Sequence, residues 1–432
     1  MTRSAHHIRR GWCPGALRPM ESGDGLIVRA KPRAGCLRVD TLIALADASL
    51  RCGNGQLELT RRANLQLRGV RRETLAELLH VLAVHGLLDE NAEAEAVRNI
   101  LVNPLAGCDP TEILDARPLA LDVERLLGAD CSLLSLPAKF AFVIDGGGTQ
   151  PLDAERADVR LRAITVGAMA QIAVGISRLG GTTWLGRTDP GTAPAAAIGA
   201  ARAFRDAQPY GGRVRLRNLT ESGVEAVRAA VSRLVDPIET PPSLRPRMPP
   251  VGLLKEKSQV FAVGVGVPFG RVDSNTLRAL AEVVTAAGAA ELRLSPWRIV
   301  FVPIRRGISA EAVLSGAAAL GFIVDGTDAL LKVSACPGSP ACRSTVADTR
   351  RDARVLAAAI AAVPDIRSVH VSGCTKGCAR SEPADLMLVA RDNDYGIIRN
   401  GIASDPPERS VPSAELSRLP ALLNRRPGAP HA

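Results

Sequence analysis

Four cysteines in the last quarter of the sequence carry its clearest chemical signal. They lie in two short pairs, Cys336 and Cys342 in ACPGSPAC, and Cys374 and Cys378 in SGCTKGCAR, with the spacing C-x5-C-x31-C-x3-C. Thiolates in short pairs on Gly- and Pro-containing loops can converge on one metal centre, because such loops bend tightly and their backbone N–H groups can point at sulfur. This pattern favours an iron–sulfur cluster.

Two other interpretations of the four thiols stay open. Zinc sites usually show a C-x2–4-C spacing in both pairs, and x5 is wider than that. A disulfide pair is disfavoured in a reducing compartment, and structural or reactive thiols are the remaining alternative. We expect a cytoplasmic protein because the segment MTRSAHHIRRGWCPG lacks the apolar region of a signal peptide. No stretch reaches the roughly 18 apolar residues of a membrane span, so no membrane contact is expected.

Arginine dominates the charge of the chain. Basic residues outnumber acidic ones by 54 to 44, and only six of the 54 are Lys. Arginine grips a carboxylate or phosphate through two parallel hydrogen bonds, which Lys cannot do. Aromatic residues make up only 3% of the chain and no nucleic-acid recognition motif is present, so few platforms exist for stacked bases. The excess favours a small polycarboxylate over nucleic acid, although a GC-rich genome is a simpler source of it.

Two distant segments share one pattern, which is a strand, a Gly turn, an amphipathic helix and an alternating strand. They span residues 25–70 and 263–304 and align at an offset of 235, where Gly35 falls on Gly270 and Leu59 on Leu294. This predicts an internal duplication of a small α+β unit.

A second internal similarity indicates that each unit is followed by a larger α/β lobe. The segment PAKFAFV at 137–143 resembles PADLMLV at 383–389. We therefore expect an α+β protein of two related halves, with a Pro-rich linker between them. The expected parts are the small units at 10–90 and 251–310, the lobes at 91–235 and 311–420, and the linker at 236–250.

The cysteine spacing after a duplicated unit resembles the sulfite and nitrite reductase superfamily. The resemblance implies two ferredoxin-like half-units, a 4Fe-4S cluster on the four cysteines, and a last cysteine that bridges to sirohaem iron. LTRRANLQ at 59–66 looks like the family's T-x-R-x-x-x-Q strand, VRN at 97–99 like its R-N step, and LPAKFA at 136–141 like its L-P-x-K-F-K segment. By this resemblance the tetrapyrrole-binding residues are Arg62, Gln66, Arg98 and Lys139, and the last two are catalytic.

Ala141 departs from the family pattern, because it replaces the second Lys of L-P-x-K-F-K. Losing one cation weakens a pocket for a small dianion, since buried charge contacts are worth more than exposed ones. Through this change and the sequence of residues 9–29, the chain resembles a branch of the superfamily whose members modify a tetrapyrrole substrate. That branch uses O2 and a reductant to hydroxylate the macrocycle and close a lactone in aerobic cobalamin biosynthesis. We expect such a monooxygenase, an oxidoreductase acting on a tetrapyrrole polycarboxylate.

The ligands of a second, oxygen-activating iron are not evident, and it could be non-haem iron or sirohaem. A non-haem facial triad needs two histidines and a carboxylate. The candidate histidines are His6, His7, His80, His85 and His370, although His80 and His85 fit a helix face better. Candidate partners for substrate carboxylates are Arg29, Arg61, Arg62, Arg68, Arg98 and Arg343. Cys13 is a weaker site candidate, and core positions are expected for Cys36, Cys52, Cys108 and Cys131.

No G-x-G-x-x-G motif is present, so we expect electrons from NADH to arrive through a separate reductase. A sirohaem-dependent sulfite or nitrite reductase is the alternative function. A non-catalytic iron–sulfur carrier or sensor is less favoured, because a duplicated chain of 432 residues is large for simple electron transfer.

Overall fold

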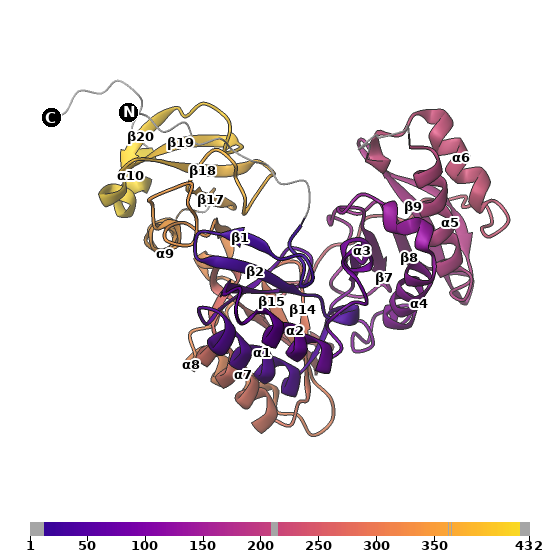
Figure 1. The fold of residues 1–432 in the computed structure, drawn as a ribbon, viewed down its shortest axis with the longest axis horizontal. Coiled ribbons are helices and arrows are strands. Elements are labelled where there is room, and N and C mark those ends of the chain that lie inside the picture. Colours follow the sequence, from indigo (N-terminus) through magenta and orange to yellow (C-terminus); the bar gives the residue numbers. More distant parts are fainter. Residues whose placement is uncertain (1–12, 209–214, 362, 364, 424–432) are drawn as a thin grey trace.

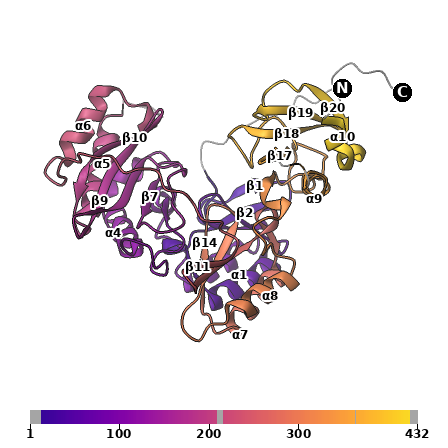
Figure 2. The ribbon, with the colours of Figure 1, turned by 180° about the vertical axis from the view of Figure 1, so that it is seen from behind.

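The computed structural model describes residues 13–208, 215–361, 363 and 365–423. Four five-stranded sheets form a central unit and two lobes, and the lobes lie on either side of the central unit (Figures 1 and 2). This confirms the expected α+β architecture. None of the described helices is long and apolar enough to cross a membrane.

The central unit holds both small units, and each lends a strand to the other. The first sheet has the order β1 (Met20–Ser22), β2 (Gly25–Ala30), β5 (Leu65–Val70), β4 (Gln56–Leu59), β13 (Arg271–Asp273). The second has the order β11 (Gly252–Glu256), β12 (Gln259–Gly266), β15 (Ile299–Pro303), β14 (Glu291–Leu294), β3 (Cys36–Arg38). Thus β13 from the second unit completes the first sheet, and β3 from the first unit completes the second.

One apolar core joins the two half-units. Helix α1 (Val39–Cys52) packs against α7 (Ser274–Ala286), with α2 (Leu75–Val84) and α8 (Ala310–Ala319) beside them. Apolar residues of both units, such as Leu45 and Leu280, are buried in this common core. Burial of this kind is the main stabilising term in folding.

The duplication predicted at an offset of 235 is confirmed by unusual backbone angles. Ala34 and Phe269 have φ of 49° and 54°, and Ala63 and Arg298 have φ of 52° and 62°. Positive φ is uncommon for residues with a Cβ atom, so its repetition at both pairs of positions shows that the two units share their turns.

The two lobes share one sheet topology, in which three parallel strands are followed by two antiparallel ones. The first lobe contains β6 (Ile100–Val102), β7 (Phe142–Asp145), β8 (Val159–Val166), β9 (Met169–Arg178), β10 (Gly181–Thr188), and the helices α3 (Ala92–Val97), α4 (Ala116–Ala129), α5 (Ala193–Asp206) and α6 (Glu221–Val231). The second contains β16 (Val333–Ala335), β17 (Val369–Ser372), β18 (Ala384–Arg391), β19 (Asp394–Gly401), β20 (Arg409–Pro412), α9 (Thr349–Ile360) and α10 (Leu419–Leu423).

Two details differ from the sequence-based expectation. The segments 137–143 and 383–389 are not equivalent, because the first leads into β7, the second strand of its lobe, whereas the second forms β18, the third. The second half-unit also extends past residue 310, since α8 packs on α7 and β12. Its Ala-rich sequence shows little contrast between faces, which hid it from the periodicity argument.

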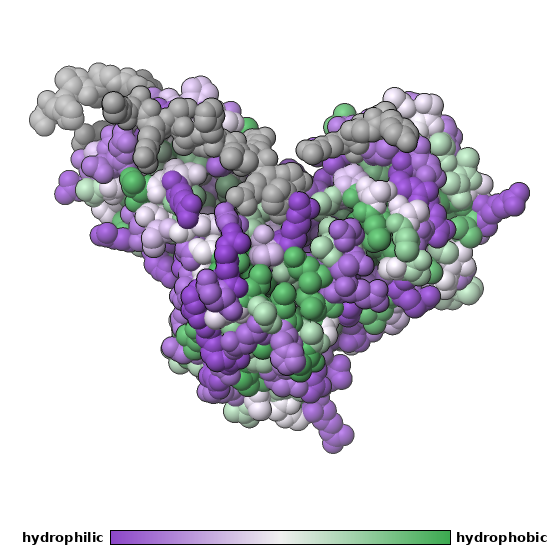
Figure 3. Space-filling model, viewed as in Figure 1, coloured by the Kyte–Doolittle hydropathy of each residue, from purple (hydrophilic) through white to green (hydrophobic). Residues whose placement is uncertain are grey.

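The predicted linker at 236–250 contains no regular element and lies against the first lobe. Arg245 forms an ion pair with Asp145 at 2.6 Å, and Met248 donates its backbone N–H to the Thr149 carbonyl oxygen at 3.1 Å. In the space-filling view a notch separates the two lobes above the central unit (Figure 3).

Candidate active site

The two cysteine pairs lie on neighbouring loops of the second lobe. The first pair follows β16 and the second follows β17, and these strands are parallel and paired. Parallel strands end at the same edge of a sheet, so the loops after them meet there. The backbone N–H of Gly373, just before Cys374, donates to the Cys336 sulfur at 3.1 Å, which joins the loops directly.

The four thiols lie within electrostatic reach of one another. Burial raises the pKa of Cys378, and the charges of Cys374, Cys336 and Cys342 raise it further. Four thiols on two adjoining loops, with a backbone N–H aimed at one sulfur, are of the kind that holds a 4Fe-4S cluster, so these residues fit that group by their chemistry. Within the described ranges, no three His, Cys, Asp or Glu side chains form a site for a single metal ion.

A buried arginine and a buried histidine lie next to the second cysteine loop. Arg298 donates to the carbonyl oxygen of Ala379, next to Cys378, at 3.3 Å. Burial, with the charges of Arg350 and Arg61, lowers the pKa of Arg298 to about 10. His370, on β17, is fully buried, and neither ring nitrogen has a partner among the described residues. Burial and the Arg298 charge lower its pKa to about 3, so the ring is neutral at physiological pH.

A pocket that is partly open to solvent lies where the central unit meets both lobes. Its cavity volume is about 210 Å³, so a large ligand would also occupy the open space in front of it. The central unit, the first lobe and the second cysteine loop all line it, through Lys31, Pro32, Arg61, Arg62, Asn64, Arg98, Asn99, Ile100, Leu101, Ala141, Glu155, Arg156, Ser381 and Glu382.

Glu382 connects the three parts of the protein at this pocket. It accepts from Arg61 of the central unit at 2.8 Å and pairs with Arg156 of the first lobe at 3.0 Å. Burial by itself would raise the pKa of Glu382, but the hydrogen bond and charge of Arg61 and the charge of Arg156 bring it down to about 2.

A duplicated turn positions several of these contacts. Thr60 Oγ1 accepts the backbone N–H groups of Arg62 and Asn64, each at 3.2 Å, which holds the turn that aims Arg62 at the pocket. At the equivalent place in the second unit, Ser295 Oγ accepts from the backbone of Trp297 and Ile299, each at 3.3 Å.

The second copy of the turn serves the same pocket from another side. The Trp297 indole N–H donates to Glu155 at 2.7 Å, and Glu155 lines the pocket. Arg298, the next residue, reaches the Ala379 carbonyl oxygen. Both copies of the duplicated turn therefore contribute to one site.

Arg62 and Arg98 line the same pocket, and they differ in how their charge is used. Arg62 Nη1 is buried and has no hydrogen-bond partner among the described residues. Arg98 donates to both oxygens of Asp89, at 2.6 and 2.9 Å. A buried carboxylate therefore occupies the fork of Arg98, and its roles in tetrapyrrole binding and catalysis stay a prediction.

Gln66 and Lys139, the other predicted tetrapyrrole contacts, do not line this pocket. Gln66 accepts two hydrogen bonds from Arg29, at 2.6 and 3.3 Å. Lys139 is exposed, although its backbone carbonyl oxygen accepts from Arg62 at 3.4 Å. Ala141, where the family pattern has Lys, does line the pocket.

Lys31 is a pocket residue that sequence reasoning missed. Its side chain is 5% exposed and its ammonium donates to the Glu95 carbonyl oxygen. Burial, with the nearby charges of Arg98 and Arg29, lowers its pKa to about 8 against the opposing charge of Glu95. Lys31 stands between Ala30 and Pro32 and belongs to no motif in the sequence. The only indication of a special role is that Lys is rare in this chain, with six Lys against 48 Arg.

Other candidates lie elsewhere. Arg29 and Arg68 are buried in hydrogen-bond networks on the first sheet, whereas Arg343 is exposed. Cys131 is exposed and Cys36 and Cys108 are half-buried, so only Cys52 of the four predicted core cysteines is fully buried. Cys13 lies beside Arg29 and Arg62. His80 is exposed on α2, and His85 follows that helix. His6 and His7 lie outside the described residues.

Comparisons with known proteins agree with this architecture. Residues 18–85 match the nitrite/sulfite reductase ferredoxin-like half domain, and residues 93–293 match the nitrite and sulphite reductase 4Fe-4S domain. The cysteine pairs lie after the second matched range. The solved structure of the Mycobacterium tuberculosis NirA protein shares the fold, with a TM-score of 0.74 over 94% of this chain and 82% of that chain at 21% identity.

Two curated relatives extend over most of the chain. A precorrin-3B synthase of Sinorhizobium sp is 35% identical over 429 residues, which is 98% of this chain and 90% of that protein. A ferredoxin–nitrite reductase of Synechococcus elongatus is 27% identical over 405 residues, which is 86% of this chain and 77% of that protein. The chain therefore belongs to the nitrite and sulfite reductase superfamily, the class that its fold and paired cysteine loops define. Within that class its similarity groups it with precorrin-3B synthase.

Proposed function

We propose that this protein is a precorrin-3B synthase-type monooxygenase of aerobic cobalamin biosynthesis. The observation that carries the proposal is the basic pocket beside the second cysteine loop, which is lined by Ala141 where the family pattern has a Lys. A small dianion has one cation fewer to bind there, whereas a macrocycle with acetate and propionate arms gains room and keeps arginine partners.

In this proposal, precorrin-3A is hydroxylated and a ring acetate closes a lactone. One atom of O2 enters the macrocycle and the other leaves as water, with two electrons and one proton supplied by NADH through a separate reductase and the second proton taken from solvent. A 4Fe-4S cluster on the four cysteines would supply one-electron transfer when bound. Arg62 would hold a substrate carboxylate through its free Nη1, and Lys31 would neutralise a second one.

The residue roles follow from burial. A hydrogen bond to a charged group inside a pocket is stronger than one in water, because little solvent competes for it. Asn64 and Asn99 add neutral donors and acceptors to the same wall. The roles first assigned to Gln66, Arg98 and Lys139 remain proposals, in which a bound macrocycle would contact Arg98 in the pocket and extend from it toward Gln66 and Lys139.

The first test is the absorption spectrum, iron content and extractable pigment of anaerobically purified protein, followed by incubation with precorrin-3A, NADH, a reductase and O2. The proposal expects cluster absorption and a hydroxylactone product whose new oxygen derives from 18O2. Extractable sirohaem with reduction of sulfite or nitrite and no change in the macrocycle would overturn it in favour of the reductase alternative. Zinc in place of iron would overturn the cluster assignment.

The ligand assignment has its own test. We expect Cys374→Ser to lose the cluster absorption, because a hydroxyl is a poor iron ligand in place of a thiolate. Cys131→Ser changes an exposed cysteine far from both loops and should keep the absorption unchanged. An unaltered cluster in Cys374→Ser would remove this residue from the ligand set.

A further inference from the structure

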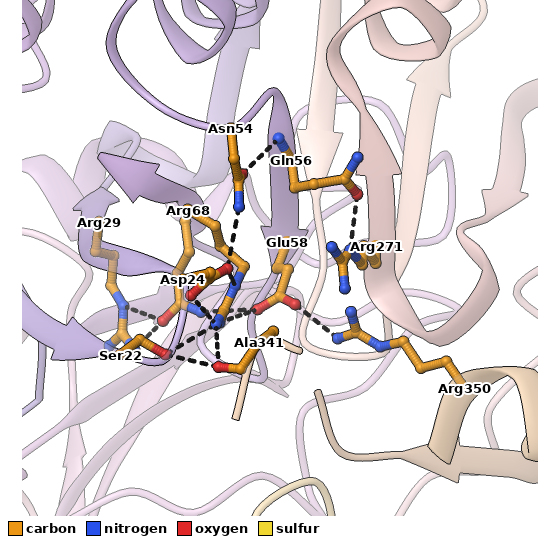
Figure 4. Close-up of polar contacts among 11 residues, drawn as sticks. Ser22, Asp24, Arg29, Asn54, Gln56, Glu58, Arg68, Arg271, Ala341 and Arg350 are labelled. Atoms are coloured by element: carbon orange, nitrogen blue, oxygen red, sulfur yellow. Dashed lines mark hydrogen bonds and ion pairs between the residues drawn. The ribbon is translucent and has the colours of Figure 1, made fainter. Parts of the chain in front are cut away.

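A buried ion cluster joins the polar face of the first sheet to the first cysteine loop (Figure 4). At its centre is Arg68 on β5, whose side chain is 2% exposed. Its Nε and Nη2 donate to the two oxygens of Asp24 at 2.9 and 2.8 Å, and its Nη1 donates to Glu58 at 3.2 Å. Two carboxylates thus fix the guanidinium in one orientation.

The same guanidinium reaches the cysteine loop. Arg68 Nη2 donates to the carbonyl oxygen of Ala341 at 3.2 Å, and Ser22 Oγ donates to the same oxygen at 3.0 Å. Ala341 directly precedes Cys342, and its partners lie 273 and 319 residues away in sequence. A Cβ atom on Gly23 would come within 2.9 Å of the Pro340 carbonyl oxygen, so the β1–β2 hairpin touches the loop backbone.

The end of the loop is held through the same cluster. Glu58 accepts from Arg350 at 2.6 Å, and Arg350 lies in the first turn of α9, which follows the loop. Within the loop, the Cys342 backbone N–H donates to Gly338 at 2.7 Å. The segment that carries Cys342 is therefore fixed at its middle by Arg68 and at its end by Arg350.

We propose that Arg68 is the positioning residue for Cys342. It acts through the Ala341 carbonyl oxygen, which is buried and needs a donor. A planar guanidinium gripped by two carboxylates is a preorganised donor, and Asp24 and Glu58 offset its charge. Arg68 therefore fixes where the Cys342 thiol lies, and its charge adds little to the electrostatic potential at that thiol. The inference rests on the proposed cluster site, and it needs no assumption about the substrate.

The decisive measurement is the alkylation rate of Cys342 in iron-free protein, followed by peptide mass spectrometry. We expect Arg68→Met to label Cys342 at least tenfold faster than the unchanged protein, because the loop loses its anchor. Labelling of the exposed Cys131 in the same sample should stay unchanged and serves as the internal reference. Arg68→Lys keeps a charged donor group but loses the planar fork, so its Cys342 labelling rate should lie between those of Arg68→Met and the unchanged protein.

Arg72→Ala is the matched control. Arg72 follows the same strand and pairs with Glu21 of the same hairpin, but that pair is exposed and does not touch the loop. In the iron-loaded protein, Arg68→Met should release iron to a chelator faster than Arg72→Ala and show an altered electron paramagnetic resonance spectrum of the reduced cluster.

An equal Cys342 labelling rate in Arg68→Met and Arg72→Ala would overturn the inference, as would a parallel rise at Cys131, which would indicate general loosening. If Arg68→Met does not fold, Ser22→Ala decides the question, because it removes a hydroxyl that donates to the Ala341 carbonyl oxygen and accepts from Arg68 Nη2 at 2.9 Å, and it leaves every ion pair intact. Labelling of iron-free protein does not depend on turnover, so failure of the proposed function would leave this result readable.

Discussion

Arg62 is the pocket residue whose unused donor best explains how a polyanion would be held. Its Nη1 is buried without a partner among the described residues. We expect Arg62→Ala to weaken binding of the macrocycle by about 1–3 kcal/mol, the scale of a lost hydrogen bond to a charged group. Fluorescence or absorption titration with the tetrapyrrole measures this, with the exposed Arg72→Ala as control. Equal affinity of both variants would place Arg62 outside the binding site.

Lys31 should make stability depend on pH in a defined window. Its pKa is lowered to about 8 from 10.5, so between these values the unfolded chain binds more protons than the folded one. The free energy of unfolding should therefore rise with pH through this window, by at most about 1.4 kcal/mol per pH unit. Below pH 8 both states are protonated and the cost of burying the ammonium is constant.

The measurement is urea unfolding of the unchanged protein and of Lys31→Met at pH 7, 8, 9 and 10. The difference in unfolding free energy between the two should change in the unchanged protein's favour above pH 8. Lys255→Met, at an exposed position, should show no such trend. Parallel curves for the Lys31 variant and the unchanged protein would show that Lys31 titrates alike in both states.

Residue identity was predictable where a motif fixed both type and spacing. The four cysteines and the turn carrying Arg62 were recognisable in this way, whereas the partner of Arg98 was not. Asp89 precedes Arg98 in a loop and its role depends on how that loop folds back. Glu382 and Lys31 likewise meet the pocket only through contacts that span the three parts of the chain.

At the scale of elements, the exchange of β3 and β13 makes the two half-units interdependent. Each central sheet takes an edge strand from the other unit, and α1 packs on α7. We expect fragments 1–245 and 246–432, expressed separately, to lack a folded central unit, because each exposes an unpaired sheet edge and an apolar helix face. Mixed during refolding, they should form a 1:1 complex.

Circular dichroism and size-exclusion chromatography with light scattering test this expectation. In hydrogen exchange, the backbone amides of β4 and β5 should be protected only in the complex. Those of β7–β9, which lie wholly within the first fragment, should be protected in the isolated fragment and in the complex alike. Full protection of β4 and β5 in the isolated first fragment would contradict the interdependence of the units.

The elements themselves were partly predictable. The repeat at an offset of 235 identified the paired units, because Gly turns and apolar positions recur at fixed distances. The repeat did not predict the strand exchange, because β3 and β13 have only three residues each and fit the edge of either sheet equally well. The false equivalence of 137–143 with 383–389 arose because two different buried strands share a Pro-Ala start and an apolar run.

At the scale of the whole molecule, Glu382 should contribute a small, pH-dependent attraction between the parts. Glu382→Gln should lower the free energy of unfolding by no more than about 1 kcal/mol at pH 7, because the pairs are partly exposed. The pKa of Glu382 is lowered to about 2, so its contribution is full above its ordinary pKa and is lost as pH falls toward 2. Unfolding at pH 7 and at pH 3 should show the difference shrinking at the lower pH, and a difference that grows there would exclude the ion pairs as its source.

The exchanged strands also set an order of events during synthesis. β4 ends at residue 59, but its neighbour β13 begins at residue 271, so the edge of the first sheet waits unpaired while the ribosome makes the whole first lobe. That lobe, with β6 to β10 in one continuous stretch, is the first part of the nascent chain that can close its own sheet. The central unit can follow only when the second unit emerges. The cysteine loops come last, and the Ala341 carbonyl oxygen then meets an Arg68 that the first sheet already holds.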